Sequence, residues 1–300
     1  MIRLGAGLNT SKPIPAVIEE ARGLAEAGFK TLSSSHIFAY DALALLQAVG
    51  EQLPEVELMT AVVPIYTKHP FALAQQALTV QAATGGRLVL GIGLSHQVVV
   101  ESVYGTPFVH PLKAMTEYLD ILLPLLHGGR AEVVGEHFSC NGGPIEIEAP
   151  APAVIVAALG SAMLELAGTR ADGTATWLTG PKTLAAHIVP TIRRAAEKAG
   201  RPSPRVMAAL PVCVTDDEPA ARLRADEIWS IYGTLPSYRA MLDREGVDSP
   251  GGAALVGDEE QLGEILDSLA AAGVTDFAGA PIGSREEVAR TRQFLAGRAG

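Results

Sequence analysis

The stretch at 85–101 reads GGRLVLGIGLSHQVVVE, and the organisation of the whole chain can be worked out from it. The apolar run in its first half predicts a short buried strand that ends in a polar turn. Gly91 and Gly93 lack the Cβ atoms that would hold a flat ligand away from the backbone. Ser95 and His96 then add a hydroxyl and a titratable ring. We therefore expect a ligand-facing strand end here, one of several.

Strand-like and helix-like segments alternate outward from this stretch to both ends of the chain. The predicted strands cover 2–8, 29–33, 56–63, 88–92, 153–158, 174–178, 205–214 and 275–278. The predicted helices cover 15–27, 41–49, 70–83, 111–127, 161–169, 181–199, 218–231, 238–245, 259–272 and 284–295. Eight strands, each followed by helical material, predict an α/β fold of the (β/α)8 TIM barrel type with its site at the carboxyl ends of the strands. An open doubly wound sheet is the alternative.

The alternation is interrupted once, after the fourth strand and helix. Residues 130–148 contain EVVGEHFSC and PIEIE, with Asn141, Gly142 and Gly143 between them. Period-two patterns around an Asn-Gly pair are typical of a hairpin. The sequence therefore predicts a small antiparallel excursion with its turn at 141–143.

Composition limits the function classes. The 300 residues are 48% hydrophobic and carry a net charge of −10, without a block of basic residues, which argues against nucleic acid as a partner. No leader and no long apolar run is present, so we expect a cytoplasmic protein without a membrane partner. Cys140 and Cys213 match neither a disulfide framework nor a metal knuckle. We expect a single domain over residues 1–300.

Two predicted helix starts have the composition of an anion site. Gly160 and Ser161 begin one helix, and Thr179, Gly180 and Lys182 surround the start of the next. Free backbone N–H groups and the helix dipole favour a phosphate at such places, and Lys182 adds a cation. The alternative is that the hydroxyl side chains only cap their helices.

Imidazole and aromatic side chains follow several of the predicted strands, namely His36, Phe38, Tyr40, Tyr66 and His96. Such a group could flank a flat ring, although ordinary packing would explain each member alone. His36, His69 and His96 could also suggest a metal site. However, no His-x-His pair follows the first strand and no Asp follows the last, so we expect no metal. Glu117 we assign to a helix surface.

With these strand ends in view, the sequence resembles the bacterial luciferase-like monooxygenase superfamily, within it the branch that uses the deazaflavin coenzyme F420. The resemblance covers nearly the whole chain. Its carriers are GFKTLSSSHIFAYDAL, TAVVPIYTKHP, GRLVLGIGLSHQ, ALGSAMLELAG, ADGTATWLTGPKT and LPSYRAMLDREGV. These motifs are specific for the superfamily and less so for the coenzyme, because relatives that bind FMN share the barrel.

The resemblance implies which residues bind the cofactor. A non-proline cis peptide that backs the ring falls near Ala61 and Val62, with Val63 beside it. The phosphate falls at the two helix starts described above. The full set that we expect at the cofactor is Ser35, His36, Tyr40, Ala61, Val62, Val63, Gly93, Ser95, Gly160, Ser161, Thr179, Gly180 and Lys182.

The function implied is an oxidoreductase that transfers a hydride between C5 of F420 and a small organic substrate. His96 is the first candidate for the proton donor or acceptor and His36 the second, because an imidazole titrates near pH 6.5. The alternatives are an FMN-dependent monooxygenase, a non-catalytic F420-binding protein and, more remotely, a metal hydrolase. Similar proteins are often dimers, so a homodimer is expected.

Overall fold

The computed structural model describes residues 2–299 and shows an α/β TIM barrel of eight parallel strands. The predicted barrel is confirmed, and an open sheet is excluded. Each barrel strand overlaps a predicted one. They are β1 (Arg3–Gly7), β2 (Thr31–Ser34), β3 (Glu57–Thr60), β5 (Leu88–Gly93), β8 (Ala153–Ala157), β9 (Gly173–Trp177), β10 (Arg205–Val214) and β12 (Asp276–Pro281).

Two short strands extend the sheet. β4 (Val63–Pro64) pairs with β5, with Val63 opposite Ile92. The predicted strand at 56–63 is therefore two strands, β3 and β4, with Ala61 and Val62 between them. β11 (Leu255–Gly257), which the sequence did not predict, pairs with the end of β10.

The helices follow the strands as predicted, with short additions. They are α1 (Ile14–Glu26), α2 (Ala42–Gly50), α3 (Pro70–Ala83), α4 (Gln97–Ser102), α5 (Pro111–Leu126), α6 (Ser161–Arg170), α7 (Pro181–Thr183), α8 (Val189–Lys198), α9 (Glu218–Trp229), α10 (Pro236–Glu245), α11 (Pro250–Ala253), α12 (Glu259–Ala272) and α13 (Arg285–Gly297). Short 3-10 helices lie at η1 (Ile65–Thr67) and η3 (Ser230–Thr234). The predicted helix at 181–199 is interrupted by a π-helical turn, η2 (Leu184–Ile188).

The antiparallel excursion is present, but its turn is not where the sequence predicted it. Strands β6 (Ala131–Val133) and β7 (Cys140–Gly142) pair with Glu132 opposite Asn141. Asn141 and Gly142 therefore belong to a strand, and the connection lies at 134–139. The carboxylate of Glu117 accepts hydrogen bonds from the backbone N–H groups of this connection. These bonds fix the connection without an Asn-Gly turn.

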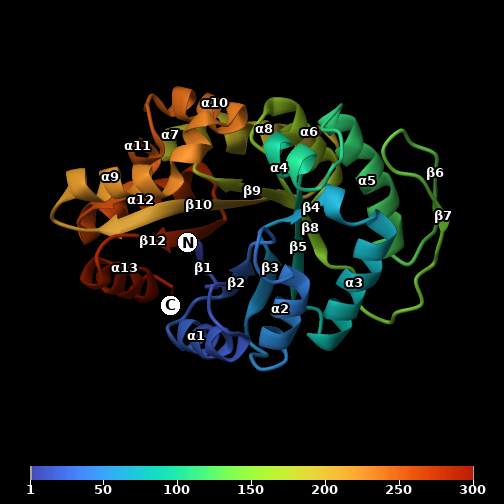
Figure 1. Ribbon diagram of the computed structural model, residues 1–300, viewed down its shortest axis with the longest axis horizontal. Helices are drawn as coiled ribbons and strands as arrows, with labels where there is room; N and C mark the ends of the chain where they lie inside the picture. Colours follow the sequence, from blue (N-terminus) through green and yellow to red (C-terminus); the bar gives the residue numbers. More distant parts are fainter. Residues whose placement is uncertain (1, 300) are drawn as a thin grey trace. The chain divides into compact units, whose positions relative to one another are not determined.

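The chain forms two compact units. The first comprises the segment up to Gly7, Gly23–Thr31 and the chain from Ala158 on. In it β10 pairs with β9, β11 and β12, and β12 pairs with β1. The second comprises Leu8–Arg22 and Leu32–Ala157, and contains β3, β5 and β8 in that order after β2. Within the second unit, α2 packs beside α3, and the β6–β7 ribbon lies along α5 (Figure 1).

Local sequence signals explain where several elements begin. His69 accepts a hydrogen bond from the backbone N of Phe71 at 3.2 Å and caps α3, which then starts with Pro70. Asp258 and Gln261 form a capping box at α12. All six residues of β5 are buried, as expected for a central parallel strand.

Candidate functional site

The connection between β3 and β4 forms a bulge in the second unit. The peptide bond between Ala61 and Val62 is cis, which confirms the bond that the resemblance implied. The backbone N of Ala61 donates to the carbonyl oxygen of Ser34, the last residue of β2, at 2.8 Å. Val63 is fully buried, whereas Ala61 and Val62 are partly exposed. The bulge therefore presents two small apolar residues at the carboxyl end of the sheet.

Gly91 and Gly93 make room for this bulge. A Cβ atom on Gly91 would overlap the carbonyl oxygen of Thr60, and one on Gly93 would lie 2.7 Å from a methyl carbon of Val62. Our interpretation that these glycines open the backbone directly to a ligand is therefore incomplete. The space that they leave is filled by protein, and their effect on any ligand passes through the position of Val62.

His36 lies half-buried in the loop after β2. Its Nδ1 accepts a hydrogen bond from the backbone N of Ala42 at 3.2 Å. Burial lowers the pKa of His36; the carboxylate of Asp41, 4.0 Å away, acts in the opposite direction, and the Lys68 ammonium lowers it further. His36 therefore stays neutral at pH 7, with its proton on Nε2.

Asp41, which lies 4.0 Å from His36, belongs to a polar network with Lys68 and Gln76. The Lys68 ammonium lies 2.5 Å from the carboxylate of Asp41 and 2.6 Å from the amide oxygen of Gln76. Asp41 also caps α2 by accepting from the backbone N of Ala44 at 3.1 Å. The network ties the end of the loop that carries His36 to the segment after the bulge, because Asp41 precedes α2 and Lys68 follows the bulge.

The other residues predicted in this loop are nearby. Ser35 is partly buried, and the hydroxyl of Tyr40 donates to the carbonyl oxygen of Lys12 at 3.1 Å. Phe38 is 72% exposed, so it lines no interior surface.

Ser95 and His96 follow β5 in a strained turn. Ser95 has a φ of 61°, in the left-handed region that few non-glycine residues adopt. His96 then begins α4 in an extended conformation. Burial lowers the pKa of His96, so this imidazole is also neutral at pH 7. In the sheet, β3 lies between β2 and β5, which places the bulge between the strands that lead to His36 and His96.

Tyr66 contributes a buried polar atom after the bulge. Among residues 2–299 its hydroxyl has no hydrogen-bond partner, and its ring packs on Phe108 with centroids 5.8 Å apart. Burial raises the pKa of Tyr66, so the hydroxyl keeps its proton. A buried hydroxyl without a partner is uncommon and indicates a place where a bound molecule can accept a hydrogen bond.

In the first unit, the start of α6 is open. Gly160 is exposed, caps the helix without a side-chain hydrogen bond, and a Cβ atom there would meet nothing within 4 Å. Ser161 is exposed as well. The buried His187 of η2 lies behind this turn, with its Nε2 2.8 Å from the carbonyl oxygen of Leu159. The predicted anion role of Gly160 and Ser161 suits this geometry and stays a prediction.

The start of α7 already has an anion from the protein. The buried carboxylate of Glu245 accepts from the backbone N of Lys182 at 3.1 Å, and from the backbone N and the hydroxyl of Thr183 at 2.8 and 2.7 Å. Gly180 is required here because a Cβ atom would overlap the Glu245 carboxylate. Thr179 is buried and Lys182 is exposed. Their proposed contact with a phosphate stays a prediction, and no local pattern in the sequence indicates the role of Glu245.

An aromatic cluster at the end of β9 also escaped the sequence analysis. Trp177 contacts Trp229 and Tyr232, and Tyr232 contacts Tyr238, with centroid distances of 5.4, 6.3 and 4.8 Å. The four residues come from β9, α9, η3 and α10. Their spacing in the sequence could not have predicted these contacts.

The fold and these strand ends can now be compared with known proteins. The model of the luciferase-like monooxygenase family matches residues 1–291. The chain belongs to the luciferase-like monooxygenase family. No helix of this luciferase-like protein within residues 2–299 has the length and apolar character needed to cross a lipid bilayer.

Three relatives illustrate what this luciferase-like protein is similar to. The 5,10-methylenetetrahydromethanopterin reductase of Methanolobus tindarius is 26% identical over 309 residues, which cover 93% of this chain and 94% of that protein. The structure of coenzyme F420-dependent tetrahydromethanopterin reductase from Methanopyrus kandleri matches with a TM-score of 0.82 and 21% identity, over 98% of this chain and 97% of that one. The oxygenating constituent of 3,6-diketocamphane monooxygenase from Pseudomonas putida, solved with FMN, matches with a TM-score of 0.75 and 16% identity, over 98% and 97%.

Proposed function

We propose that this luciferase-like protein is an F420-dependent oxidoreductase that transfers a hydride between C5 of the deazaflavin and a small organic substrate. The observation that carries the proposal is the order β2-β3-β5 in the second unit. It sets the Ala61–Val62 bulge between two strands whose following loops each carry a half-buried, neutral imidazole. A small apolar surface with a proton-carrying group on either side suits a flat redox ring.

The residues present fit such a group. Tyr66 offers a buried hydroxyl that lacks a partner among the described residues, and a bound molecule would satisfy it. The bulge supplies partly exposed apolar atoms at Ala61 and Val62, with the fully buried Val63 behind them. When bound, F420 would supply the hydride chemistry, and the protein would supply orientation and proton transfer.

The chain's own residues then have distinct tasks. His96 exchanges the proton that accompanies the hydride, because burial keeps it neutral and able to accept. His36 is the second candidate, since its Nδ1 is used by Ala42 and its Nε2 carries a proton to donate. Ser35, Tyr40 and Ser95 line the same strand ends and position the ring, and Gly93 acts on it through the position of Val62.

We also propose a phosphate-binding place within the first unit. The open start of α6 at Gly160 and Ser161 offers backbone N–H groups without a side-chain cap. The exposed Lys182 adds a positive charge near the next helix start, where Thr179 and Gly180 shape the turn. Because Glu245 already accepts the N–H groups of Lys182 and Thr183, the ammonium rather than the backbone of Lys182 would meet a phosphate.

An FMN-dependent monooxygenase is the second candidate. It is favoured by the structural likeness to the FMN-containing protein from Pseudomonas putida. The relative from Methanopyrus kandleri, whose name gives F420, matches with the higher TM-score, and this supports the deazaflavin.

Binding of the two cofactors to the purified protein distinguishes these functions. The protein is titrated with F420 and with FMN while the fluorescence of each cofactor is followed. We expect saturable binding of F420, and oxidation of F420H2 when a panel of small carbonyl and enone compounds is added. Retention of FMN without F420 binding would establish the monooxygenase instead, and F420 binding without turnover on any compound would favour a carrier.

The proton role is tested with single variants. His96→Ala should slow hydride transfer by about 100-fold, because general acid–base catalysis contributes roughly that much or more, and F420 affinity should change little. His36→Ala should have the smaller effect. His127→Ala, at the exposed end of α5, is the matched control. An unchanged pH profile in His96→Ala removes His96 from the reaction.

A further inference from the structure

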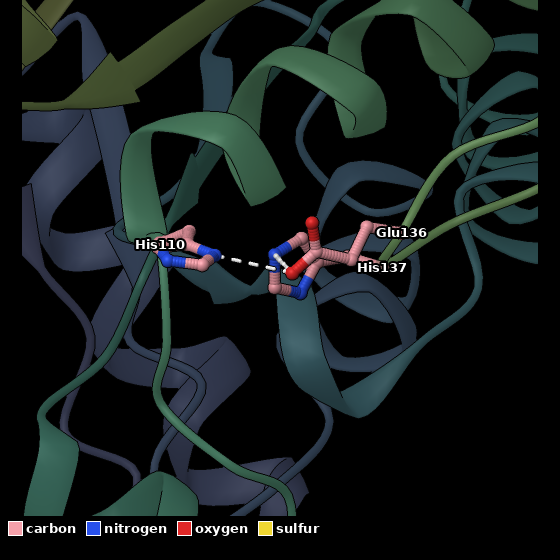
Figure 2. A group of neighbouring side chains, drawn as sticks. All are labelled: His110, Glu136 and His137. Carbon is pink, nitrogen blue, oxygen red and sulfur yellow. Dashed lines mark hydrogen bonds and ion pairs between the residues drawn. The ribbon is translucent and has the colours of Figure 1, made fainter.

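Two imidazoles and a carboxylate meet at the surface of the second unit. His110 is the residue before α5, and Glu136 and His137 lie in the connection between β6 and β7 (Figure 2). The Nδ1 of His110 lies 3.1 Å from Oε1 of Glu136, and the Nε2 of His137 lies 3.9 Å from the same oxygen. The three ligand atoms all lie within 4.8 Å of one another.

The connection that carries two of these residues is held in place by Glu117. The Glu117 carboxylate accepts the backbone N–H groups of Glu136, His137 and Phe138, at 3.0, 2.7 and 3.1 Å. Glu117 is 7% exposed, so our assignment of it to a helix surface is wrong. Sequence spacing hid its role because its partners are backbone groups 19 to 21 residues away. Glu136 and His137 thus stand on a fixed backbone.

The ring of His137 has a buried nitrogen that no described residue satisfies. Its side chain is 11% exposed, and its Nε2 is buried without a hydrogen-bond partner among the described residues. A buried ring nitrogen normally has a partner, because burial without one carries an uncompensated desolvation cost. Oε1 of Glu136, 3.9 Å away, is too far for a hydrogen bond and is close to the separation of two ligands on one metal ion.

The distances agree with a first-row transition metal. Zinc binds imidazole nitrogen and carboxylate oxygen at about 2.0–2.2 Å, so neighbouring ligand atoms in a tetrahedron lie about 3.3–3.5 Å apart. The observed separations of 3.1 and 3.9 Å lie on either side of that value. The His110 side chain is 67% exposed and can turn toward an ion. Imidazole with carboxylate is a ligand set that suits zinc, nickel or cobalt better than magnesium or calcium.

Lys113 is the competitor for the same carboxylate. Its ammonium lies 2.6 Å from Oε2 of Glu136, one turn into α5 from His110. This pair occupies one carboxylate oxygen and leaves Oε1 facing the two imidazoles. The positive charge of Lys113 opposes a second cation nearby and therefore weakens metal binding.

We propose that His110, Glu136 and His137 bind one divalent transition-metal ion. The ion would be ligated by Nδ1 of His110, Oε1 of Glu136 and Nε2 of His137, and water would occupy the remaining positions on the exposed side. Such an ion joins the start of α5 to the β6–β7 connection. It gives Nε2 of His137 a partner, which residues 2–299 do not supply, and it requires neither F420 nor turnover.

The proposal is tested by calorimetry. Zn²⁺ is titrated into protein from which a chelator has removed any bound metal. We expect one Zn²⁺ per chain and no heat from Mg²⁺ in the same buffer. His110→Ala and Glu136→Gln should each weaken Zn²⁺ binding by about tenfold or more, since each removes a direct ligand. His127→Ala, which alters an exposed histidine at the other end of α5, should bind Zn²⁺ as the unchanged protein does.

Lys113→Met should change the Zn²⁺ affinity in the opposite direction. Removal of the competing ammonium should strengthen Zn²⁺ binding, a result that non-specific histidine binding would not produce. His137→Gln is used only if its thermal unfolding without metal matches that of the unchanged protein. The proposal is overturned if Zn²⁺ does not bind at one equivalent, if His127→Ala weakens binding as much as His110→Ala, or if Lys113→Met leaves the affinity unchanged or lower.

Discussion

Thr60 and Gly91 are joined by two hydrogen bonds through one hydroxyl group. The Thr60 Oγ1 donates to the carbonyl oxygen of Gly91 and accepts from its backbone N, both at 2.8 Å. This pairing takes the place of regular strand pairing where β3 ends and the Ala61–Val62 bulge begins. It requires the two backbones to approach so closely that only glycine fits at 91.

Gly91→Ala should therefore lower the free energy of unfolding by about 1–3 kcal/mol, the usual cost of overfilling a packed interior. The added Cβ would overlap the carbonyl oxygen of Thr60 and push the bulge outward. Urea denaturation measures the loss. Gly23→Ala is the control, because Gly23 is exposed in α1 and a Cβ atom there meets nothing, so that variant should be neutral or slightly more stable. Equal stability of the two variants would contradict the packing argument.

Glu117→Gln should lower the free energy of unfolding by about 1–3 kcal/mol, because a charged acceptor of three backbone N–H groups is replaced by a neutral one. Thermal and urea unfolding measure the loss at pH 7. Glu101→Gln is the matched control, since Glu101 is exposed on α4. Amide exchange at 136–138 should quicken in the first variant only.

The same residue gives a pH dependence. Burial alone would raise the pKa of Glu117, but the hydrogen bonds from His137, Glu136 and Phe138 outweigh it and lower the pKa. A carboxyl with a lowered pKa in the folded state stabilises the fold above its unfolded value of about 4.3, and this contribution is lost as the pH falls through the folded value. Glu117→Gln should flatten the fall in stability below pH 4.3, and Glu101→Gln should not.

Lys68 and Asp41 act on His36 with opposite signs. Because the ammonium lowers the pKa of His36 and the carboxylate raises it, Lys68→Met should raise that pKa and Asp41→Asn should lower it further. Asn at 41 can still cap α2. Histidine signals followed by NMR between pH 4 and 8 measure both shifts. A change of the same sign in the two variants would show that burial, rather than these charges, is what they alter.

The same shift has a consequence for stability. An imidazole whose pKa is lower in the folded state adds nothing above its unfolded value of about 6.5 and destabilises the fold progressively below it. The drop between pH 6.5 and 5 should therefore be smaller in Lys68→Met and larger in Asp41→Asn, each relative to that variant's own stability at pH 7.5.

Tyr66→Phe removes a buried hydroxyl for which residues 2–299 offer no hydrogen-bond partner. The protein without ligand should keep its stability or gain up to about 1 kcal/mol, because an unsatisfied polar group is removed. Binding of F420 or of substrate should weaken if a bound molecule uses this hydroxyl. Tyr40→Phe is the contrast, since the Tyr40 hydroxyl donates to Lys12 and its loss should destabilise. Weaker folding of Tyr66→Phe without ligand would show that its hydroxyl has a partner after all.

Patterns along the chain predicted the fold well and the site in part. The helices at 70–83 and 259–272 and the strand at 205–214 have the predicted bounds, because prolines, capping residues and apolar periodicity mark them locally. The Asn-Gly pair at 141 and 142 predicted a turn, but both residues lie in β7. The connection is instead at 134–139, where the Glu117 carboxylate of α5 accepts backbone N–H groups.

What the sequence could not predict is contact between distant residues. The contact of Trp177 with Trp229, the placement of Glu245 at the start of α7 and the meeting of His110 with His137 all join residues 27 or more positions apart. None follows a local pattern, so only the fold brings them together.

Glu245 has a further consequence for exchanges of sequence between relatives. The turn at 179–183 has its carboxylate acceptor more than sixty residues later, in α10. A chimera that received the 235–247 segment from a relative without Glu245 would leave the backbone N–H groups of Lys182 and Thr183 without the carboxylate that accepts them. The turn before α7 and the segment that ends at Glu245 must therefore be transplanted as a pair.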